Sequence, residues 1–201
     1  MNVYSNNKNV KLAYFAGGCF WGMEYFFRRK TALISIVSGY MRSGLPHTSH
    51  NSNLNAEDCI SGKTGYNTEG DRFNNNTVLP LRYEDVCTGK TGYLETVEVS
   101  YLPEEITYEE LVKYFFEIHD PTQKNGQGPD IGEQYKSAVF YGTTEEKDTI
   151  YSIIEILESK GYDIATKVLP AGTFIRAEEY HQNYYGRHKA IPYCHAYKKR
   201  F

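Results

Sequence analysis

Short apolar runs, separated by polar and glycine-rich turns, predict a series of strands along the chain. Residues 11–16 (KLAYFA) form an apolar run that ends in two glycines, which is typical of a strand entering a tight turn. Residues 32–37 (ALISIV) predict a second strand, and residues 94–101 (LETVEVSY) alternate well enough to predict a third. Residues 137–141 (SAVFY) predict a fourth strand.

Apolar residues at helical spacing predict three helices between these strands. Residues 23–30 place Met and Phe at helical intervals and end in three basic residues, which suit a helix C-terminus. Thr107 and Glu110 form a T-x-x-E capping box ahead of an apolar pattern, and Thr143 and Glu146 repeat that signal. Strands that alternate with amphipathic helices indicate an α/β or α+β core.

Two long segments interrupt this pattern. Residues 120–135 are rich in Gly and Pro without periodicity, and a loop of that length is usually functional or disordered. Residues 43–81 are rich in Asn, Ser and Gly and favour a solvated insertion. Within the insertion, residues 57–66 closely match residues 84–93, except that the cysteine and its aliphatic neighbour are exchanged. We interpret the match as a partial tandem duplication that lengthened a loop.

Composition limits the class of protein. The chain has 201 residues and a formal charge of −3, which predicts one domain, or one domain carrying an insertion. The balanced charge argues against a nucleic-acid binder. No apolar run approaches the roughly 18 residues that a membrane span needs, and the N-terminus lacks the apolar stretch of a secretory signal. We therefore expect a cytoplasmic protein.

In a cytoplasmic protein the four cysteines are not expected to form structural disulfides, because these are rare in a reducing compartment. No C-x-x-C pair is present, so a four-cysteine zinc site is not expected. Cys19 follows the first predicted strand and a glycine turn, where a helix N-terminus would favour its thiolate. A small buried hydrophobic role is the competing interpretation of Cys19.

A reactive cysteine in this position fits several classes of enzyme. A hydrolase would need a histidine base, for which His119 and His181 are nominal candidates. A peroxidase or disulfide exchanger would need a second cysteine. A sulfoxide reductase would also need an acid for the oxygen and an apolar pocket for a methyl group. Separately, His47, His50 and Cys59 are candidate metal ligands in the insertion, although a polar surface loop is the commoner explanation of such residues.

Five sequence blocks, in a fixed order, narrow the choice between these classes of enzyme. They are GCFWG at 18–22, YEDVCTG at 83–89, TGYLE at 91–95, HDPTQ…QG…D…QY at 119–135, and AEEYHQ at 177–182 with a later YC at 193–194. Together these blocks resemble the peptide methionine sulfoxide reductase A (MsrA) family. Tyr93, Gly126 and Pro129 depart from the residues usual in that family.

The resemblance implies a fold and an activity. The fold would be α+β: a single domain over residues 1–201, built as a two-layer sheet and helix sandwich of the ferredoxin-like MsrA type, with a loop insertion at about 43–82. The substrates would be free methionine-S-sulfoxide and oxidised proteins. Electrons would come from thioredoxin or a similar dithiol, without a metal or an organic cofactor. Neither nucleic acid nor a membrane is an expected partner.

The resemblance also implies the residues that carry the reaction. Cys19 would attack the sulfoxide sulfur as a thiolate, and Glu95, kept neutral by burial, would protonate the oxygen. Tyr83 and Tyr135 would hydrogen-bond that oxygen. Cys194, in a polar and mobile C-terminal tail, would resolve the resulting sulfenic acid.

Three further residues would bind the substrate: Phe20 and Trp21 as the wall for the methyl group, and Asp130 near the pocket. Core packing is the alternative for Phe20, and loop capping is the alternative for Asp130. Cys59 competes with Cys194 as the resolving thiol, whereas Cys87 is expected to pack in the interior. His119 is expected to be structural, at the end of its helix. The alternative for the whole chain is a non-catalytic protein that binds methionine or its sulfoxide.

Overall fold

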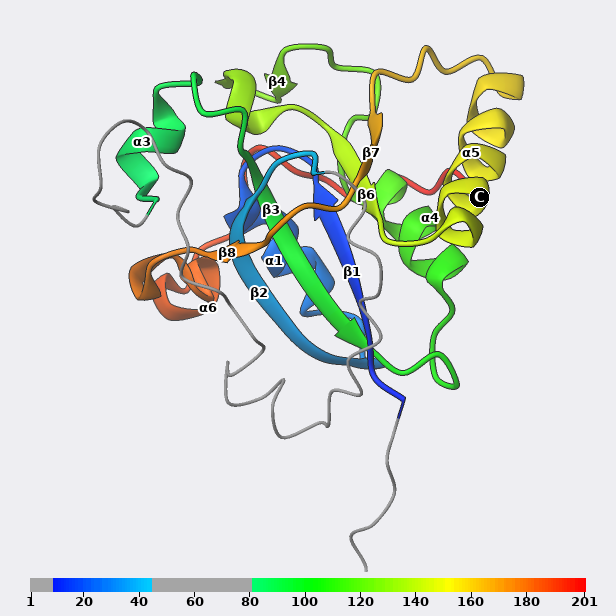
Figure 1. Ribbon diagram of the computed structural model, residues 1–201, viewed down its shortest axis with the longest axis horizontal. Helices are drawn as coiled ribbons and strands as arrows, with labels where there is room; N and C mark the ends of the chain where they lie inside the picture. Colours follow the sequence, from blue (N-terminus) through cyan, green and yellow to red (C-terminus); the bar gives the residue numbers. More distant parts are fainter. Residues whose placement is uncertain (1–8, 45–80) are drawn as a thin grey trace, which may run out of the picture.

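The computed structural model describes residues 9–44 and 81–201 (Figure 1). The first copy of the internal repeat lies outside the described residues, as does the alternative metal site at His47, His50 and Cys59. Within the described ranges, no helix has the length and apolar character needed to cross a membrane.

A mixed six-stranded sheet forms the centre of the fold. Its strands lie in the order β7-β6-β1-β3-β2-β8, and every neighbouring pair is antiparallel except β6 and β7. The strands are β1 (Lys11–Ala16), β2 (Leu33–Met41), β3 (Leu94–Tyr101), β6 (Ala138–Tyr141), β7 (Lys167–Pro170) and β8 (Ile175–Arg176). A separate two-stranded hairpin joins β4 (Gly126–Gln127) to β5 (Asp130–Ile131).

The helices pack against this sheet and against one another. They are α1 (Phe20–Phe27), α3 (Tyr83–Cys87), α4 (Tyr108–Ile118), α5 (Thr144–Ser159) and α6 (Tyr184–His188), with 3₁₀ turns at Glu133–Tyr135 and Glu179–His181. In Figure 1, α1 lies behind the sheet, and α4 and α5 lie together beyond its β6 side. The expected α+β fold, with sheet and helices in layers, is confirmed.

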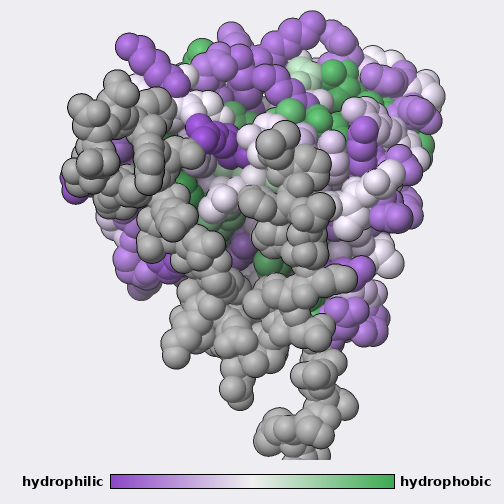
Figure 2. Space-filling model, viewed as in Figure 1, coloured by the Kyte–Doolittle hydropathy of each residue, from purple (hydrophilic) through white to green (hydrophobic). Residues whose placement is uncertain are grey.

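Aromatic stacking joins the helices to the sheet. Phe15 of β1 stacks on Phe27 of α1 and on Phe115 of α4, with both ring centroids 5.2 Å away. On the other side, the connection from β7 to β8 crosses the sheet and packs Phe174 against Tyr14, at 5.7 Å between ring centroids. Because both faces are covered, all eight residues of β3 are buried, which explains their imperfect alternation. Accordingly, apolar residues form only small patches among hydrophilic ones on the face in Figure 2.

Local sequence signals predicted which helices and strands are present more accurately than they predicted where each one begins and ends. The strand expected at 94–101 and both threonine caps are observed, with Thr107 accepting the Glu110 N–H at 3.2 Å. Helix α1 begins directly after Cys19, where the sequence predicted a helix N-terminus, but it ends at Phe27 rather than at residue 30. Strand β2 continues to Met41, since it pairs with β3 along its whole length. The short elements in 120–135 and after residue 165 were not predicted.

Candidate active site

A tight glycine turn presents Cys19 at the start of α1. Gly18 has a φ of +97°, a conformation that side chains disfavour, and a Cβ there would lie 2.2 Å from the Gln127 side chain. The turn therefore brings the end of β1 against the β4–β5 hairpin. Cys19 follows as the helix N-cap, and its side chain is buried.

Glu95 lies beside this helix start. It is carried by β3, is only 2 % exposed, and accepts the backbone N–H of Phe20 through Oε2 at 3.0 Å. Burial and the nearby Cys19 thiol raise the pKa of Glu95 well above its usual value, although the Phe20 N–H opposes the shift. This direction favours the neutral form of the carboxyl, which is the form that can donate a proton.

Cys194 and Asp130 complete the immediate surroundings of Cys19. The two sulfurs and an Asp130 carboxylate oxygen all lie within 4.8 Å of one another. Asp130 accepts a hydrogen bond from Tyr193 Oη at 3.3 Å through Oδ1. Its buried Oδ2 has no hydrogen-bond partner among the described residues. Asp130 therefore offers one oxygen to the space between the thiols.

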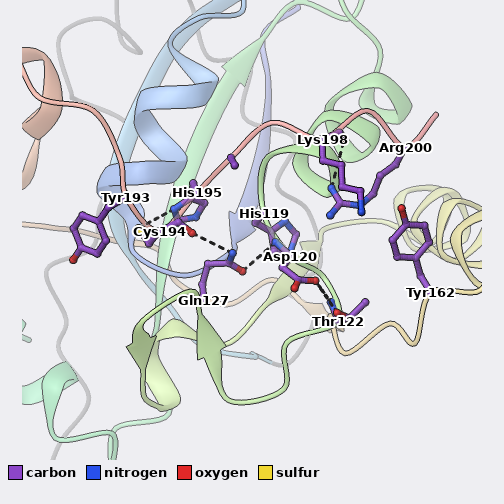
Figure 3. Close-up of a pocket in the computed structure, with 11 residues that line it drawn as sticks. His119, Asp120, Thr122, Gln127, Tyr162, Tyr193, Cys194, His195, Lys198 and Arg200 are labelled. Atoms are coloured by element: carbon purple, nitrogen blue, oxygen red, sulfur yellow. Dashed lines mark hydrogen bonds between the residues drawn. The ribbon is translucent and has the colours of Figure 1, made fainter.

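The segment that carries Cys194 differs from the mobile tail we expected. Cys194 is buried, and its carbonyl accepts a hydrogen bond from Gln127 Nε2 at 3.2 Å (Figure 3). Further on, the Lys198 N–H donates to the Glu117 carbonyl at 2.7 Å, and Arg200 binds the end of α4. These bonds place Cys194 against Cys19 without the swing of a loose chain end.

The pKa of Cys19 in the resting site favours the thiol over the thiolate. Its interaction with the Cys194 thiol, together with burial, raises the pKa of Cys19 well above the ordinary value. The Trp21 backbone N–H opposes this shift, and the negative charge of Asp130 adds to it. The helix N-terminus is thus outweighed by burial and by a second thiol, so Cys19 rests in the protonated form.

The two phenols assigned to the sulfoxide oxygen meet near these groups. Tyr83 and Tyr135 are half-buried, and their side chains interact with each other. Burial is the main cause that raises the pKa of both phenols. Both hydroxyls therefore stay protonated and can donate hydrogen bonds. The Tyr83 backbone N–H donates to Glu178 Oε1 at 2.9 Å, which holds the start of α3.

Phe20 and Trp21 occupy different environments. The Phe20 ring is 1 % exposed and packs near Tyr40 and His181, at centroid distances of 5.7 and 5.0 Å. Trp21 is half-exposed and stacks on Tyr184 at 3.7 Å with an interplanar angle of 5°. Its Nε1–H donates to His181 Nδ1 at 3.0 Å. Trp21 is therefore fixed in orientation with part of its surface accessible.

The histidines of the hydrolase alternative are engaged elsewhere. His181 Nδ1 accepts the Trp21 hydrogen bond. His119 caps α4 and uses both ring nitrogens, towards the Phe115 carbonyl at 2.7 Å and Ser137 Oγ at 2.8 Å. His119 is thus structural, as expected. Among the described residues neither ring hydrogen-bonds to Cys19, and His181 Nε2 is buried there without a hydrogen-bond partner.

Several residues of the site were not assigned a role in it from sequence. Glu178 bonds both Tyr40 and Tyr83, and Gln127 holds Cys194. Both residues lie within the sequence blocks that resemble the MsrA family, and their place in these blocks was the only signal in the sequence that could have pointed to them. Cys87 was expected to pack in the interior, but it is exposed at the end of α3, because α3 lies outside the sheet layers.

The thiols and the carboxylate of the site are side chains that can bind a metal ion or take part in redox chemistry. Cys19, Asp130 and Cys194 are the group of described residues close enough to share a metal ion. The two thiols are free and adjacent, and a short approach would form a disulfide between them. Paired free thiols beside a neutral buried carboxyl define a thiol-dependent oxidoreductase.

Comparison with known proteins identifies the family within this class. A family model described as peptide methionine sulfoxide reductase matches residues 11–68 and 56–201. The chain belongs to that family, as an oxidoreductase of the MsrA type. The two matched ranges overlap at residues 56–68, which contain the first copy of the internal repeat. The resemblance carried by the five blocks is therefore confirmed.

Individual relatives support the assignment over most of the chain. Peptide methionine sulfoxide reductase MsrA of Sulfolobus acidocaldarius is 34% identical over 92% of this chain and 87% of its own length. The Methanothermobacter thermautotrophicus MsrA is 39% identical over 86% and 84%. Reduced Mxr1 from Saccharomyces cerevisiae has a TM-score of 0.73 and 32% identity, with 94% and 93% covered. An unusual oxidised form of Mxr1 has a TM-score of 0.58, so the fold is more similar to the reduced form.

Proposed function

We propose that this chain reduces the S epimer of methionine sulfoxide, free or within oxidised proteins, with Cys19 as the nucleophile. The observation that carries the proposal is the placement of Glu95. A buried, neutral carboxyl is bonded to the residue that follows Cys19. A sulfoxide oxygen needs a proton as its sulfur is attacked, and this carboxyl supplies one next to the attacking thiol.

In the first step, the Cys19 sulfur attacks the sulfoxide sulfur and Glu95 gives its proton to the oxygen, while the proton that leaves the Cys19 thiol returns Glu95 to its neutral form. Tyr83 and Tyr135 donate hydrogen bonds to the same oxygen while negative charge grows on it. Trp21 and Phe20 form the apolar wall that receives the methyl group, and Asp130 lies at the edge of the pocket. Methionine leaves, and the oxygen remains on Cys19 as a sulfenic acid.

In the second step, the Cys194 thiol attacks the Cys19 sulfenic acid, which forms a disulfide and releases water. The proximity of the two sulfurs supports this pairing. Thioredoxin or a similar dithiol then reduces the disulfide. A protein reductant is supported by yeast Mxr1, which has been solved in complex with Trx2. None of these steps calls for a metal or an organic cofactor.

The test is an assay of each separate epimer of methionine sulfoxide with dithiothreitol as the reductant. We expect methionine from the S epimer, none from the R epimer, and none from either with Cys19→Ser. Binding of the S epimer without methionine release by the parent would favour the non-catalytic alternative. Reduction of the R epimer at an equal rate would contradict the proposed specificity.

A further inference from the structure

His195 is a buried histidine that the proposed reaction leaves without a task. It follows Cys194 directly, and its Nδ1 lies 3.1 Å from the Cys194 sulfur (Figure 3). Its other nitrogen, Nε2, lies 2.7 Å from the carbonyl oxygen of Gly17, in the turn before Cys19. One imidazole therefore connects the second thiol to the loop that presents the first.

The Gly17 contact decides which nitrogen carries the proton. A carbonyl oxygen can only accept a hydrogen bond, so His195 Nε2 is the protonated nitrogen and the donor. In the neutral ring, Nδ1 then has a free lone pair and accepts the S–H of Cys194. Burial lowers the pKa of His195 to about 4, so the ring is neutral at physiological pH. The orientation is that of a base facing a thiol.

The surrounding backbone is shaped to admit this ring. A Cβ on Gly22 of α1 would lie 2.2 Å from His195 Nδ1, so only glycine leaves room for the imidazole. Gln127 of β4 holds the Cys194 carbonyl from the opposite side. Both contacts fix the thiol and the imidazole relative to each other, and neither needs the substrate to be present.

The surroundings of the His195 ring shift its pKa in opposite directions. Burial disfavours the imidazolium form, whereas the hydrogen bond to the Gly17 carbonyl and the negative charge of Asp130 on β5 favour it. His119, at the end of α4, lines the same cavity of about 410 Å³, but both its nitrogens are bonded elsewhere. Cys19 and Cys194 are the thiols nearby. Asp130 is therefore the group that can stabilise a proton transiently held by His195.

We propose that His195 is the general base of the resolving step and accepts the Cys194 proton through Nδ1 as this thiol attacks the Cys19 sulfenic acid. This assignment rests on the proposed function. The Cys194 sulfur forms the S–S bond with an electron pair of its own and is oxidised. The Cys19 sulfur is reduced as its S–O bond breaks, and the leaving hydroxide takes the proton back from His195 to form water.

The test separates methionine release from disulfide formation in a single turnover without reductant. The parent enzyme is mixed with methionine-S-sulfoxide, and samples are quenched for methionine and for the mapped Cys19–Cys194 disulfide. In His195→Gln, the side-chain amide can still donate to Gly17 but has no basic nitrogen for Cys194. We expect this variant to release one methionine per enzyme and to form the disulfide about 10²-fold more slowly.

A second variant and a matched control distinguish chemistry from packing. In His195→Ala, added imidazole can enter the cavity and should accelerate disulfide formation. His119→Gln alters the other buried histidine of the same cavity and should leave the disulfide rate within a few-fold of the parent. A 1,3-diketone that traps sulfenic acids should label Cys19 in the His195 variants much more than in the parent.

The other outcomes overturn the inference. Disulfide formation in His195→Gln within a few-fold of the parent would remove the base role. Equal slowing in His119→Gln, without an imidazole response in His195→Ala, would assign the effect to packing. Loss of methionine release in His195→Gln alone would move the residue to the first step. Failure of the parent to release methionine would instead overturn the proposed function itself.

Discussion

The Phe20 backbone N–H donates to Oε2 of Glu95 at 3.0 Å, and this one bond ties the first turn of α1 to β3. The nucleophile and the acid lie 76 positions apart in the sequence, yet a bond to the residue after Cys19 fixes the carboxyl beside it. Since the bond uses an acceptor oxygen, a side-chain amide can preserve it while removing the acidic proton. The chemistry of Glu95 can therefore be separated from its structural contact.

Glu95→Gln should keep the fold and slow methionine release. The amide still accepts the Phe20 N–H but cannot give a proton to the sulfoxide oxygen at neutral pH. Loss of a positioned general acid costs roughly 10²–10⁴-fold in rate. Single-turnover release of methionine measures this step, and a rate within a few-fold of the parent would remove Glu95 from the acid role.

The same substitution should change how stability depends on pH. Because the folded state raises the pKa of Glu95, the parent is at full relative stability below the unfolded value, near 4.3. As pH rises from there to the folded pKa, ionisation of Glu95 lowers the free energy of unfolding of the parent by about 1.4 kcal/mol per pH unit. Glu95→Gln should therefore gain stability over the parent as pH rises from about 4.3 towards the raised folded pKa. Urea unfolding of both proteins across that range measures the difference, and a constant difference would contradict a raised pKa.

Cys194→Ala should make Cys19 more reactive towards alkylation. The substitution removes the thiol that is the main cause of the raised Cys19 pKa, so the thiolate fraction at neutral pH should increase. The pH dependence of Cys19 alkylation, followed by peptide mapping, measures the change. Cys87→Ala is the matched control, because Cys87 is exposed at the end of α3. An unchanged or higher pKa in Cys194→Ala would show that burial alone sets it.

Replacing the resolving thiol should stall turnover after one cycle. Cys194→Ser should release one methionine per enzyme and then stop with thioredoxin as the reductant, whereas Cys59→Ser should turn over normally. Cys194 is buried beside Cys19, and Cys59 lies outside the described residues. Full turnover of Cys194→Ser, with a mapped Cys19–Cys59 disulfide, would transfer the resolving role to the insertion.

Deleting residues 45–80 should leave activity on free methionine sulfoxide within an order of magnitude. Long surface loops cost little closure entropy, so a short glycine linker can replace one without unfolding the core. The deletion keeps Gly44, whose N–H donates to the Pro170 carbonyl, and Leu81, which packs against the core. The S-epimer assay measures the outcome. A folded but inactive deletion variant would place the insertion in the mechanism.

Local sequence patterns were sufficient for most of the regular structure. The strand at 94–101 and the threonine caps at 107 and 143 follow from interactions within a few residues. The end of β2 did not follow, because pairing with β3 lengthens this strand to Met41. Strands β7 and β8 escaped prediction because their hydrogen bonds join them to strands far away in the sequence.

The sequence by itself determined the family, through the order of its motifs, and with it the candidates Cys19, Glu95 and Cys194. Only the tertiary structure decided their states. Burial keeps Glu95 neutral, and a neighbouring Cys194 keeps Cys19 protonated where the helix end alone predicted a thiolate. Contacts with α4 and Gln127 replace the expected mobile tail with a fixed thiol, and the Gly17 carbonyl sets the tautomer of His195. These properties depend on which groups meet in space and how little water reaches them, and neither is encoded in the local order of residues.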